Sequence, residues 1–297
     1  MRVDDSATVR GSVAVRGGTA SAALGVLGFS FTFPATAWAL EGFGPWTSTA
    51  LRCGLAALLA AAFLRASRAP LPTRKQLPGL LVVALGCVVG FPLLSTLALE
   101  TTSTGNAAVV IGALPIATAA FASVRTGRRH SPLFWGAAAV GAGTVIGFTL
   151  LRTGGAPGLG DLFLFGALVA CAAGYAEGGR LAGEMPGSHV ISWGLVLSLP
   201  VMAPLSAAGL ALEPVHLTGT ALAGLAYLVA VSQFGAFVVW YRGMGLIGVG
   251  RASQIQLAQP LLTLVWAVLL LGEELSPAAP VAAAVVLGCI AVTQRAK

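Results

Sequence analysis

Charged side chains are scarce in this chain: among 297 residues there are 17 Lys and Arg and 10 Asp and Glu, which is 9%. Soluble domains carry roughly 25% charged residues, so this shortage argues against a soluble protein. Hydrophobic residues make up 57% of the chain, and the mean hydropathy is +0.88. The sequence therefore predicts a multi-pass membrane protein, in which the net charge of +7 does not indicate a nucleic-acid partner.

Residues that hold metals or form disulfides are also few. The four cysteines each lie inside an apolar run without a close Cys or His partner, which is typical of small buried hydrophobes. The three histidines, His130, His189 and His216, fall at the ends of predicted helices, too far apart for a metal site. We expect no metal and no cofactor.

Sequence motifs for enzymatic chemistry are missing as well. There is no Walker sequence, so ATP is not expected to drive the protein directly. Residues 245–250 are rich in glycine, but they form a turn between two predicted membrane helices. An intramembrane enzyme would need paired Asp, His or Ser/Lys groups at one depth, and the sequence does not provide them. A transporter is favoured over an enzyme or a structural scaffold.

Apolar segments of about the length that crosses a bilayer, roughly 20 residues, recur along the chain. In lipid the backbone N–H and C=O groups must be hydrogen-bonded within the protein, so apolar runs of this length are expected to form helices. The ten predicted helices span 19–40, 45–64, 77–99, 103–124, 132–151, 160–182, 189–211, 217–241, 251–271 and 277–294. The first one follows basic residues and contains Ala37-Trp38-Ala39, which resembles a signal-peptide cleavage site. It is longer than a typical signal-peptide core and contains Pro34, so we expect it to be retained.

The charges are divided between the two ends of these helices. With the N-terminus in the cytosol, 15 of the 17 Lys and Arg fall at cytosolic ends, and only Arg52 and Arg152 fall at the outer ends. The outer ends collect acidic residues: Glu41, Glu100, Asp161, Glu213, Glu273 and Glu274. This asymmetry follows the positive-inside rule. It predicts a cell inner-membrane protein with both termini in the cytoplasm.

Two stretches of the chain repeat each other. When residues 105–143 are shifted by 145 positions onto residues 250–288, landmark residues coincide. The matched pairs are Gly105 with Gly250, Pro115 with Pro260, Gly127 with Gly272, Ser131-Pro132 with Ser276-Pro277, and Gly143 with Gly288. A period near half the length of so apolar a chain indicates a duplicated membrane bundle.

Because each half holds five predicted helices, an odd number, the second half enters the membrane upside down relative to the first. The predicted fold is an all-α membrane protein of ten transmembrane helices, arranged as two inverted five-helix repeats around a central cavity. The expected parts are a cytosolic tail (1–18), a first repeat (19–152), a linker (153–159) and a second repeat (160–297). Ser131 and Ser276 are expected to cap the helices that follow them.

Several of these segments resemble the drug/metabolite transporter superfamily. Residues 44–59, "GPWTSTALRCGLAALL", resemble its Pro-x6-Arg opening of helix 2. Residues 97–115 and 269–292 resemble its helix 3–4 and helix 9–10 signatures, as in the ten-helix EamA-type exporters that include the aromatic amino-acid exporter. Two positions depart from a symmetric repeat, since Trp193 stands where the first half has Arg52, and Arg128 stands in place of Glu273. The resemblance leaves the substrate open among amino acids, drugs, sugars and nucleotide sugars.

The resemblance implies that helices 1, 3, 4, 6, 8 and 9 line the central cavity and that helices 5 and 10 are peripheral. Polar and aromatic residues concentrate on those six helices, and large polar groups are costly against lipid. The candidate substrate-binding residues are Ser30, Thr32, Ser95, Asn106, Tyr175, Gln233, Phe237, Gln254, Gln256 and Gln259.

The glutamines of the ninth helix form the sharpest cluster. Gln256 and Gln259 share a helix face, and Pro260 has no N–H to donate to the carbonyl of Gln256. Two amides and a free carbonyl suit the ammonium and carboxylate of a zwitterion, although hydrogen bonding between helices is an equal alternative. Pro34, Pro92 and Pro115 similarly release the carbonyls of Ser30, Val88 and Ile111, at a substrate contact or at a structural kink.

Four further residues are candidates for a gate or for coupling: Glu177, Arg180, Trp240 and Tyr241. Glu177 and Arg180 are three apart near the cytosolic end of the sixth helix, where they form either a simple ion pair or an inner gate. Trp240 and Tyr241 lie near a helix end, a position that favours the interfacial aromatic belt over a substrate contact.

Together these features predict a carrier that exports amino acids, with aromatic or other apolar side chains, by alternating access. The alternative is an exporter of another small metabolite or drug of the same superfamily. The expected partners are a small-molecule substrate and the lipid bilayer, without nucleic acid.

Overall fold

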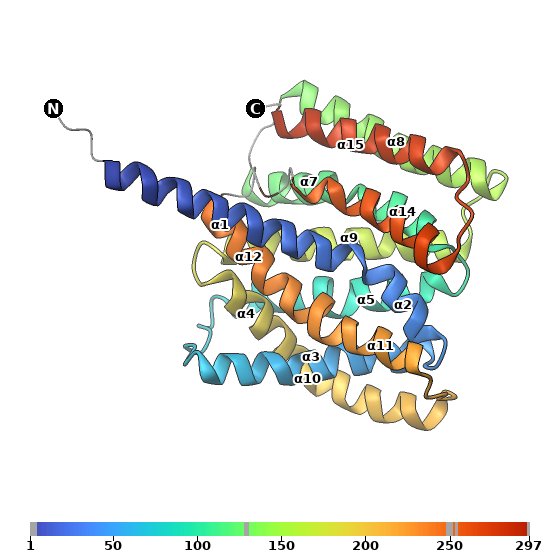
Figure 1. The fold of residues 1–297 in the computed structure, drawn as a ribbon, viewed down its shortest axis with the longest axis horizontal. Coiled ribbons are helices and arrows are strands. Elements are labelled where there is room, and N and C mark those ends of the chain that lie inside the picture. Colours follow the sequence, from blue (N-terminus) through green and yellow to red (C-terminus); the bar gives the residue numbers. More distant parts are fainter. Residues whose placement is uncertain (1–4, 128–130, 248–251, 253–254, 296–297) are drawn as a thin grey trace.

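The computed structural model of the protein describes residues 5–127, 131–247, 252 and 255–295. Within these residues every regular element is a helix, and one isolated antiparallel bridge joins Phe43 to Val215. The all-helical prediction is confirmed for this part of the chain. Figure 1 shows the helices lying alongside one another, with α8 and α15 at one edge of the bundle and α3 and α10 at the opposite edge.

Eight helical spans are long and apolar enough to cross a membrane. Four of them are interrupted and consist of two or three elements. In chain order the spans are α1 (Asp5–Ser30) with α2 (Thr32–Leu40), α3 (Pro45–Ala66), α4 (Leu77–Val83) with η1 (Ala84–Gly90) and α5 (Phe91–Leu99), α6 (Thr104–Gly112) with α7 (Leu114–Thr126), α8 (Pro132–Thr153), α9 (Leu159–Leu181), α10 (Gly187–Leu212), and α11 (Gly219–Tyr227) with η2 (Leu228–Gly235) and α12 (Ala236–Ile247).

The two remaining predicted segments coincide with shorter apolar helices, α14 (Ala258–Leu271) and α15 (Ala278–Arg295). The expected tail is helical from Asp5, because α1 runs without interruption from the polar N-terminal residues into the apolar segment. Ser131 caps α8 as predicted, since its side chain accepts a hydrogen bond from the backbone N–H of Phe134.

Proline residues mark the helix interruptions. The first span breaks at Phe31, three residues before Pro34, and the fourth breaks at Ala113, two residues before Pro115. A proline has no N–H, so it leaves a carbonyl of the preceding turn without its helical donor. Side chains of other helices bind two of the predicted free carbonyls: the Thr263 hydroxyl donates to Ser30 O at 2.8 Å, and the Cys53 thiol donates to Val88 O at 2.9 Å.

Several local features recur 145 residues apart, as the sequence repeat does. Gly127 ends α7 and Gly272 ends α14, both in the left-handed conformation, with φ of 66° and 63°. The π-helical segments η1 and η2 also coincide under the same shift, apart from one extra residue at the start of η2. π-Helical turns are rare in proteins, and those that occur often lie at functional sites. The third and eighth spans therefore share an unusual feature near their middles.

Helices of the first half pack extensively against helices of the second half. The largest contacts join α3 to α10, α1 to α12, α8 to α15, and α5 to α9. Glu213, the residue after α10, bonds to the backbone at the start of α3, so these two helices run antiparallel. The space between the halves is therefore enclosed by elements from both.

Small residues permit the close crossing of the third and sixth spans. A Cβ atom placed on Gly86 would lie 2.3 Å from the carbonyl oxygen of Ala170 and 3.0 Å from the backbone nitrogen of Gly174. Membrane helices associate largely through such close backbone packing. This crossing brings Cys87 and Tyr175 to the centre of the bundle.

Candidate functional site

A cavity of about 30 Å³ lies at the centre of the bundle, between the two halves. Its volume accommodates little more than a water molecule. Both halves contribute aromatic rings and polar groups to it. The lining comprises Phe29, Thr32, Phe33, Arg52, Cys87, Phe91, Ile111, Leu114, Cys171, Tyr175, Ser232, Gln233, Phe237 and Gln259.

Arg52 is the charged member of this lining and is only 2% exposed. Its Nε donates a hydrogen bond to Gln233 Oε1 at 2.8 Å, and its Nη2 donates to Ser232 Oγ at 3.1 Å. Both acceptors belong to η2, whose π-helical backbone carries adjacent residues toward the first half. Nη1 is buried and has no hydrogen-bond partner among the described residues, and no carboxylate there pairs with Arg52.

The polar groups around Arg52 form a continuous set. The hydroxyls of Thr32 and Ser232 lie 2.8 Å apart within hydrogen-bond distance, and Gln233 Nε2 lies 3.5 Å from the carbonyl oxygen of Cys87. The set therefore connects the first, second, third and eighth spans through their side chains.

Aromatic rings also line the cavity. The ring of Phe237 packs edge-on against those of Phe29 (4.7 Å between centroids) and Tyr175 (6.0 Å). Edge-to-face pairs of this kind are favourable and leave ring faces available for a further apolar group. The centre of the protein thus combines one buried cation with several aromatic surfaces.

A second, smaller cavity of about 20 Å³ adjoins the first, beside the break between α6 and α7 and the start of α14. Gln256 and Pro260 line this second cavity, and Gln259 lines both. Phe33, Ile111 and Leu114 also belong to both linings. The two cavities therefore share part of their lining.

The structure brings five of the predicted substrate-binding residues together around the central cavity. They are Thr32, Tyr175, Gln233, Phe237 and Gln259. Gln256 lies in the adjoining cavity. Gln254 lies outside the described residues.

Ser30 and Ser95 do not line either cavity, in contrast to the prediction. The Ser30 hydroxyl donates to Leu27 O and accepts from Trp266 Nε1 at 3.0 Å, so it stabilises the helix break at Phe31. The Ser95 hydroxyl donates to Pro92 O at 3.2 Å within α5. Each hydroxyl satisfies the local backbone, which a count of polar residues along a helix does not reveal.

Asn106 was predicted at the substrate site but lies at the end of the bundle, in the first turn of α6. It lines an open hollow of about 560 Å³ with Glu100, Arg152 and Glu274. We call this end of the bundle the acidic end and define it by five residues: Glu41, Glu100, Asp161, Glu213 and Glu273. The opposite end of the bundle is the basic end, defined by Arg65, Arg68, Arg74, Arg125 and Arg180. The correction follows from the start of α6 at Thr104, which leaves Asn106 only one turn deep.

Two glutamates at the acidic end cap helices of the other half. Glu213 accepts hydrogen bonds from the backbone N–H of Trp46 and of Thr47 at the start of α3. Glu273 accepts from the backbone N–H of Thr104 (2.8 Å) and of Gly105 (2.9 Å) at the start of α6. A carboxylate at a helix N-terminus satisfies free N–H groups and complements the helix dipole, so these contacts tie the two halves together at the acidic end.

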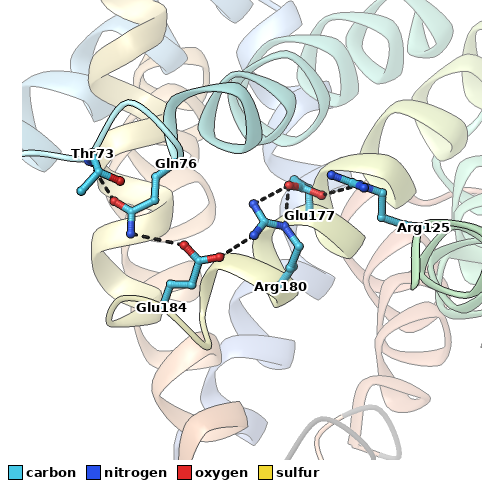
Figure 2. A network of polar contacts seen from close by, with 6 residues as sticks. All are labelled: Thr73, Gln76, Arg125, Glu177, Arg180 and Glu184. Carbon is cyan, nitrogen blue, oxygen red and sulfur yellow. Dashed lines mark hydrogen bonds and ion pairs between the residues drawn. The ribbon is translucent and has the colours of Figure 1, made fainter. Parts of the chain in front are cut away.

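An ion-pair network crosses the basic end (Figure 2). Glu177 lies between Arg180, at 2.7 Å, and Arg125 of α7, at 3.5 Å. Arg180 also pairs with Glu184, which in turn accepts a hydrogen bond from Gln76 Nε2 at 3.4 Å. The predicted ion pair between Glu177 and Arg180 is thus present, and Arg125 extends it to another helix.

Trp240 and Tyr241 are buried, 3% and 4% exposed, so the interpretation as an interfacial belt is wrong. Trp240 packs against Phe29, and Tyr241 stacks on Phe237. The close approach of Gly178 and Gly187 to Tyr241 encloses its ring. Tyr241 therefore lies between the central cavity and the network at the basic end.

Arg52 is the residue that the sequence analysis misplaced. The charge asymmetry counted it with the outer helix ends, although the predicted second helix, residues 45–64, contains it. In the structure it lies two turns inside α3, and helix 2 therefore lines the cavity, in addition to the helices expected from the resemblance. The available signal was an ionisable residue within an apolar segment, which marks a functional site by default.

The chain matches known proteins over most of its length. The sequence model of the EamA-like transporter family matches it twice, over residues 16–150 and 158–294. It is 41% identical over 272 residues to the uncharacterized transporter YdeK of Bacillus subtilis (strain 168), covering 92% of this chain and 95% of that protein. A protein of known crystal structure, 21% identical, shares the fold with a TM-score of 0.63 over 93% of this chain and 97% of its own.

Proposed function

The chain belongs to the EamA-like transporter family, and on that premise we propose that it exports amino acids with aromatic or other apolar side chains from the cytoplasm. The observation that carries the proposal is the central cavity, where a buried arginine and two glutamines face aromatic rings from both halves. The polar groups suit the charged end of an amino acid, and the rings suit an apolar side chain.

The proposed architecture is ten membrane helices in two inverted five-helix repeats, with the basic end in the cytoplasm. It is supported by the two family matches, one in each half, and by the left-handed glycines and π-helical segments that recur 145 residues apart. The positive-inside rule supports the orientation.

Transport would follow alternating access, in which the halves rock around a site near the midplane. The central cavity, at about 30 Å³, is far below the roughly 300 Å³ at which pockets for small ligands begin. Substrate entry therefore requires one end of the bundle to open. The ion pairs of Glu177 would break when the basic end opens, and the caps formed by Glu213 and Glu273 would break when the acidic end opens.

The experiment is uptake into proteoliposomes that contain the purified protein, with a panel of radiolabelled amino acids, measured with and without an imposed pH gradient. The proposal expects saturable uptake of phenylalanine, tyrosine, tryptophan or leucine above that of protein-free liposomes, and little uptake of lysine or aspartate. Uptake restricted to a sugar or a drug in a parallel panel would instead support the other transport function. The comparison with and without the gradient separates proton coupling from facilitated exchange.

A further inference from the structure

We propose that Arg52 is the anion-binding residue of the central cavity and that the transported substrate is recognised by its carboxylate rather than by its amine. This inference rests on the proposed transport function and names the chemical class that the site accepts. It would extend the substrates to apolar monocarboxylates that have no amino group.

The hydrogen bonding of Arg52 is incomplete. A guanidinium has five N–H donors, and the described residues provide acceptors for Nε and for Nη2, namely Gln233 and Ser232. Nη1 keeps its two donors without a partner although it is buried. A buried donor that lacks an acceptor is costly, and a carboxylate is the acceptor whose geometry matches the arginine fork.

The residues around Arg52 do not neutralise its charge. The linings of the two adjoining cavities contain no Asp or Glu among the described residues, so the charge of Arg52 has no counter-ion in either lining. A buried charge is stable when it is paired. A monoanion would neutralise the cavity, whereas an ammonium group without a carboxylate would add a second positive charge in a region of low dielectric constant.

Hydrogen bonds fix the position of the Arg52 guanidinium. Gln233 and Ser232 hold it from one side, and Thr32 in turn contacts Ser232, so the remaining donors are oriented before any substrate arrives. Such orientation in advance reduces the entropic cost of binding. Phe237 and Tyr175, which line the same cavity, would then contact the apolar portion of the substrate.

The test compares four probes with the full-length protein in lipid nanodiscs: phenylalanine, phenylpyruvate, phenylalaninamide and phenylethylamine. The first two have a carboxylate and the last two do not, while the ring is the same in all four. We expect phenylalanine and phenylpyruvate to bind, by calorimetry and by a raised unfolding temperature, and the other two to bind at least about tenfold more weakly. Phenylethylamine or the amide binding as tightly as phenylalanine would overturn the inference.

Variants of the arginine provide the second arm. Arg52→Gln should weaken phenylalanine and phenylpyruvate about tenfold or more, and Arg52→Lys, which keeps the charge but loses the fork, should weaken them less. The matched control is Arg65→Gln, which alters an exposed arginine of the same helix and should bind as the wild type does. Wild-type affinity in Arg52→Gln would contradict the inference. If that variant does not fold, the four probes on the wild-type protein decide alone.

Failure of this inference can be distinguished from failure of the proposed function. Uptake of phenylalanine that is matched by uptake of its amide and is independent of Arg52 would remove the inference and leave amino-acid transport intact. Uptake of phenylpyruvate through Arg52, with no amino acid carried, would support the inference and remove amino-acid export.

Discussion

Glu213 accepts hydrogen bonds from both the backbone N–H (2.7 Å) and the hydroxyl (2.6 Å) of Thr47, a residue 166 positions earlier in the chain. This single carboxylate joins the end of α10 to the start of α3 and so ties the two halves at the acidic end. The bridge between Phe43 and Val215 lies beside it. An acidic end that must open during transport would have to break these contacts.

Replacing Glu213 by alanine should destabilise the protein and loosen the acidic end. The change removes an acceptor for three donors at a helix N-terminus, a loss of roughly 0.5–2 kcal/mol for a cap of this kind. Thermal unfolding of the purified protein measures it, with Glu41→Ala, an exposed glutamate of the same end, as the control. Equal unfolding temperatures for Glu213→Ala and the wild type would show that the cap contributes nothing to closure.

Gly86→Ala should lower the unfolding temperature, although alanine is the better helix former. The added Cβ would meet the Ala170 carbonyl at 2.3 Å, so the third and sixth spans would have to separate, at a cost of about 1–3 kcal/mol for an overpacked contact. The matched control is Gly143→Ala in α8, where nothing lies within 4 Å of the new Cβ. That variant should be neutral or stabilised, and a similar loss in both variants would contradict the close-crossing argument.

Glu177→Gln should make the central cavity more accessible from the basic end, because it removes the charge that pairs with both Arg125 and Arg180. The native thiols of Cys87 and Cys171 line the cavity and report its accessibility. We expect a severalfold faster reaction with a membrane-impermeant maleimide in inside-out vesicles.

The control for that experiment is Glu184→Gln, which removes a more exposed ion pair with Arg180; pairs of this kind contribute little. A variant that lacks both cavity cysteines shows the labelling that arises elsewhere. Unchanged labelling of Glu177→Gln, with the protein folded, would mean that the network does not gate the cavity.

Gln259→Ala should impair uptake more than Gln256→Ala. Gln259 lines the central cavity as well as the adjoining one, whereas Gln256 lines only the latter. The loss of one hydrogen bond to a charged substrate predicts a rise in KM of about tenfold for Gln259→Ala. Initial uptake rates over a range of phenylalanine concentrations would measure this, and equal KM values for the two variants and the wild type would assign both glutamines to helix packing.

Much of the fold could be predicted from the sequence because long apolar runs and charge asymmetry leave few alternatives in lipid. Pro34 and Pro115 indicated the helix breaks for the same reason, since the missing N–H acts locally. The π-helical segments could not be predicted, because the extra residue in each turn depends on how the third and eighth spans pack against their neighbours.

The candidate site could be predicted only in part. Gln233, Phe237 and Gln259 line the central cavity, as expected from the tendency of large polar side chains on membrane helices to face the bundle interior. Ser30 and Ser95 line neither cavity, because each hydroxyl hydrogen-bonds to the backbone of its own helix and the sequence does not show which way a hydroxyl turns. The second predicted helix already begins at residue 45 and contains Arg52, but the sequence does not show the partners that η2 presents to its guanidinium.

The most direct test of the central claim is the initial rate of radiolabelled phenylalanine uptake by proteoliposomes containing the wild-type protein. The proposed function predicts a saturable rate above that of protein-free liposomes, which excess unlabelled phenylalanine suppresses. A rate equal to that of protein-free liposomes for every aromatic and apolar amino acid, with the protein folded and inserted, would contradict it.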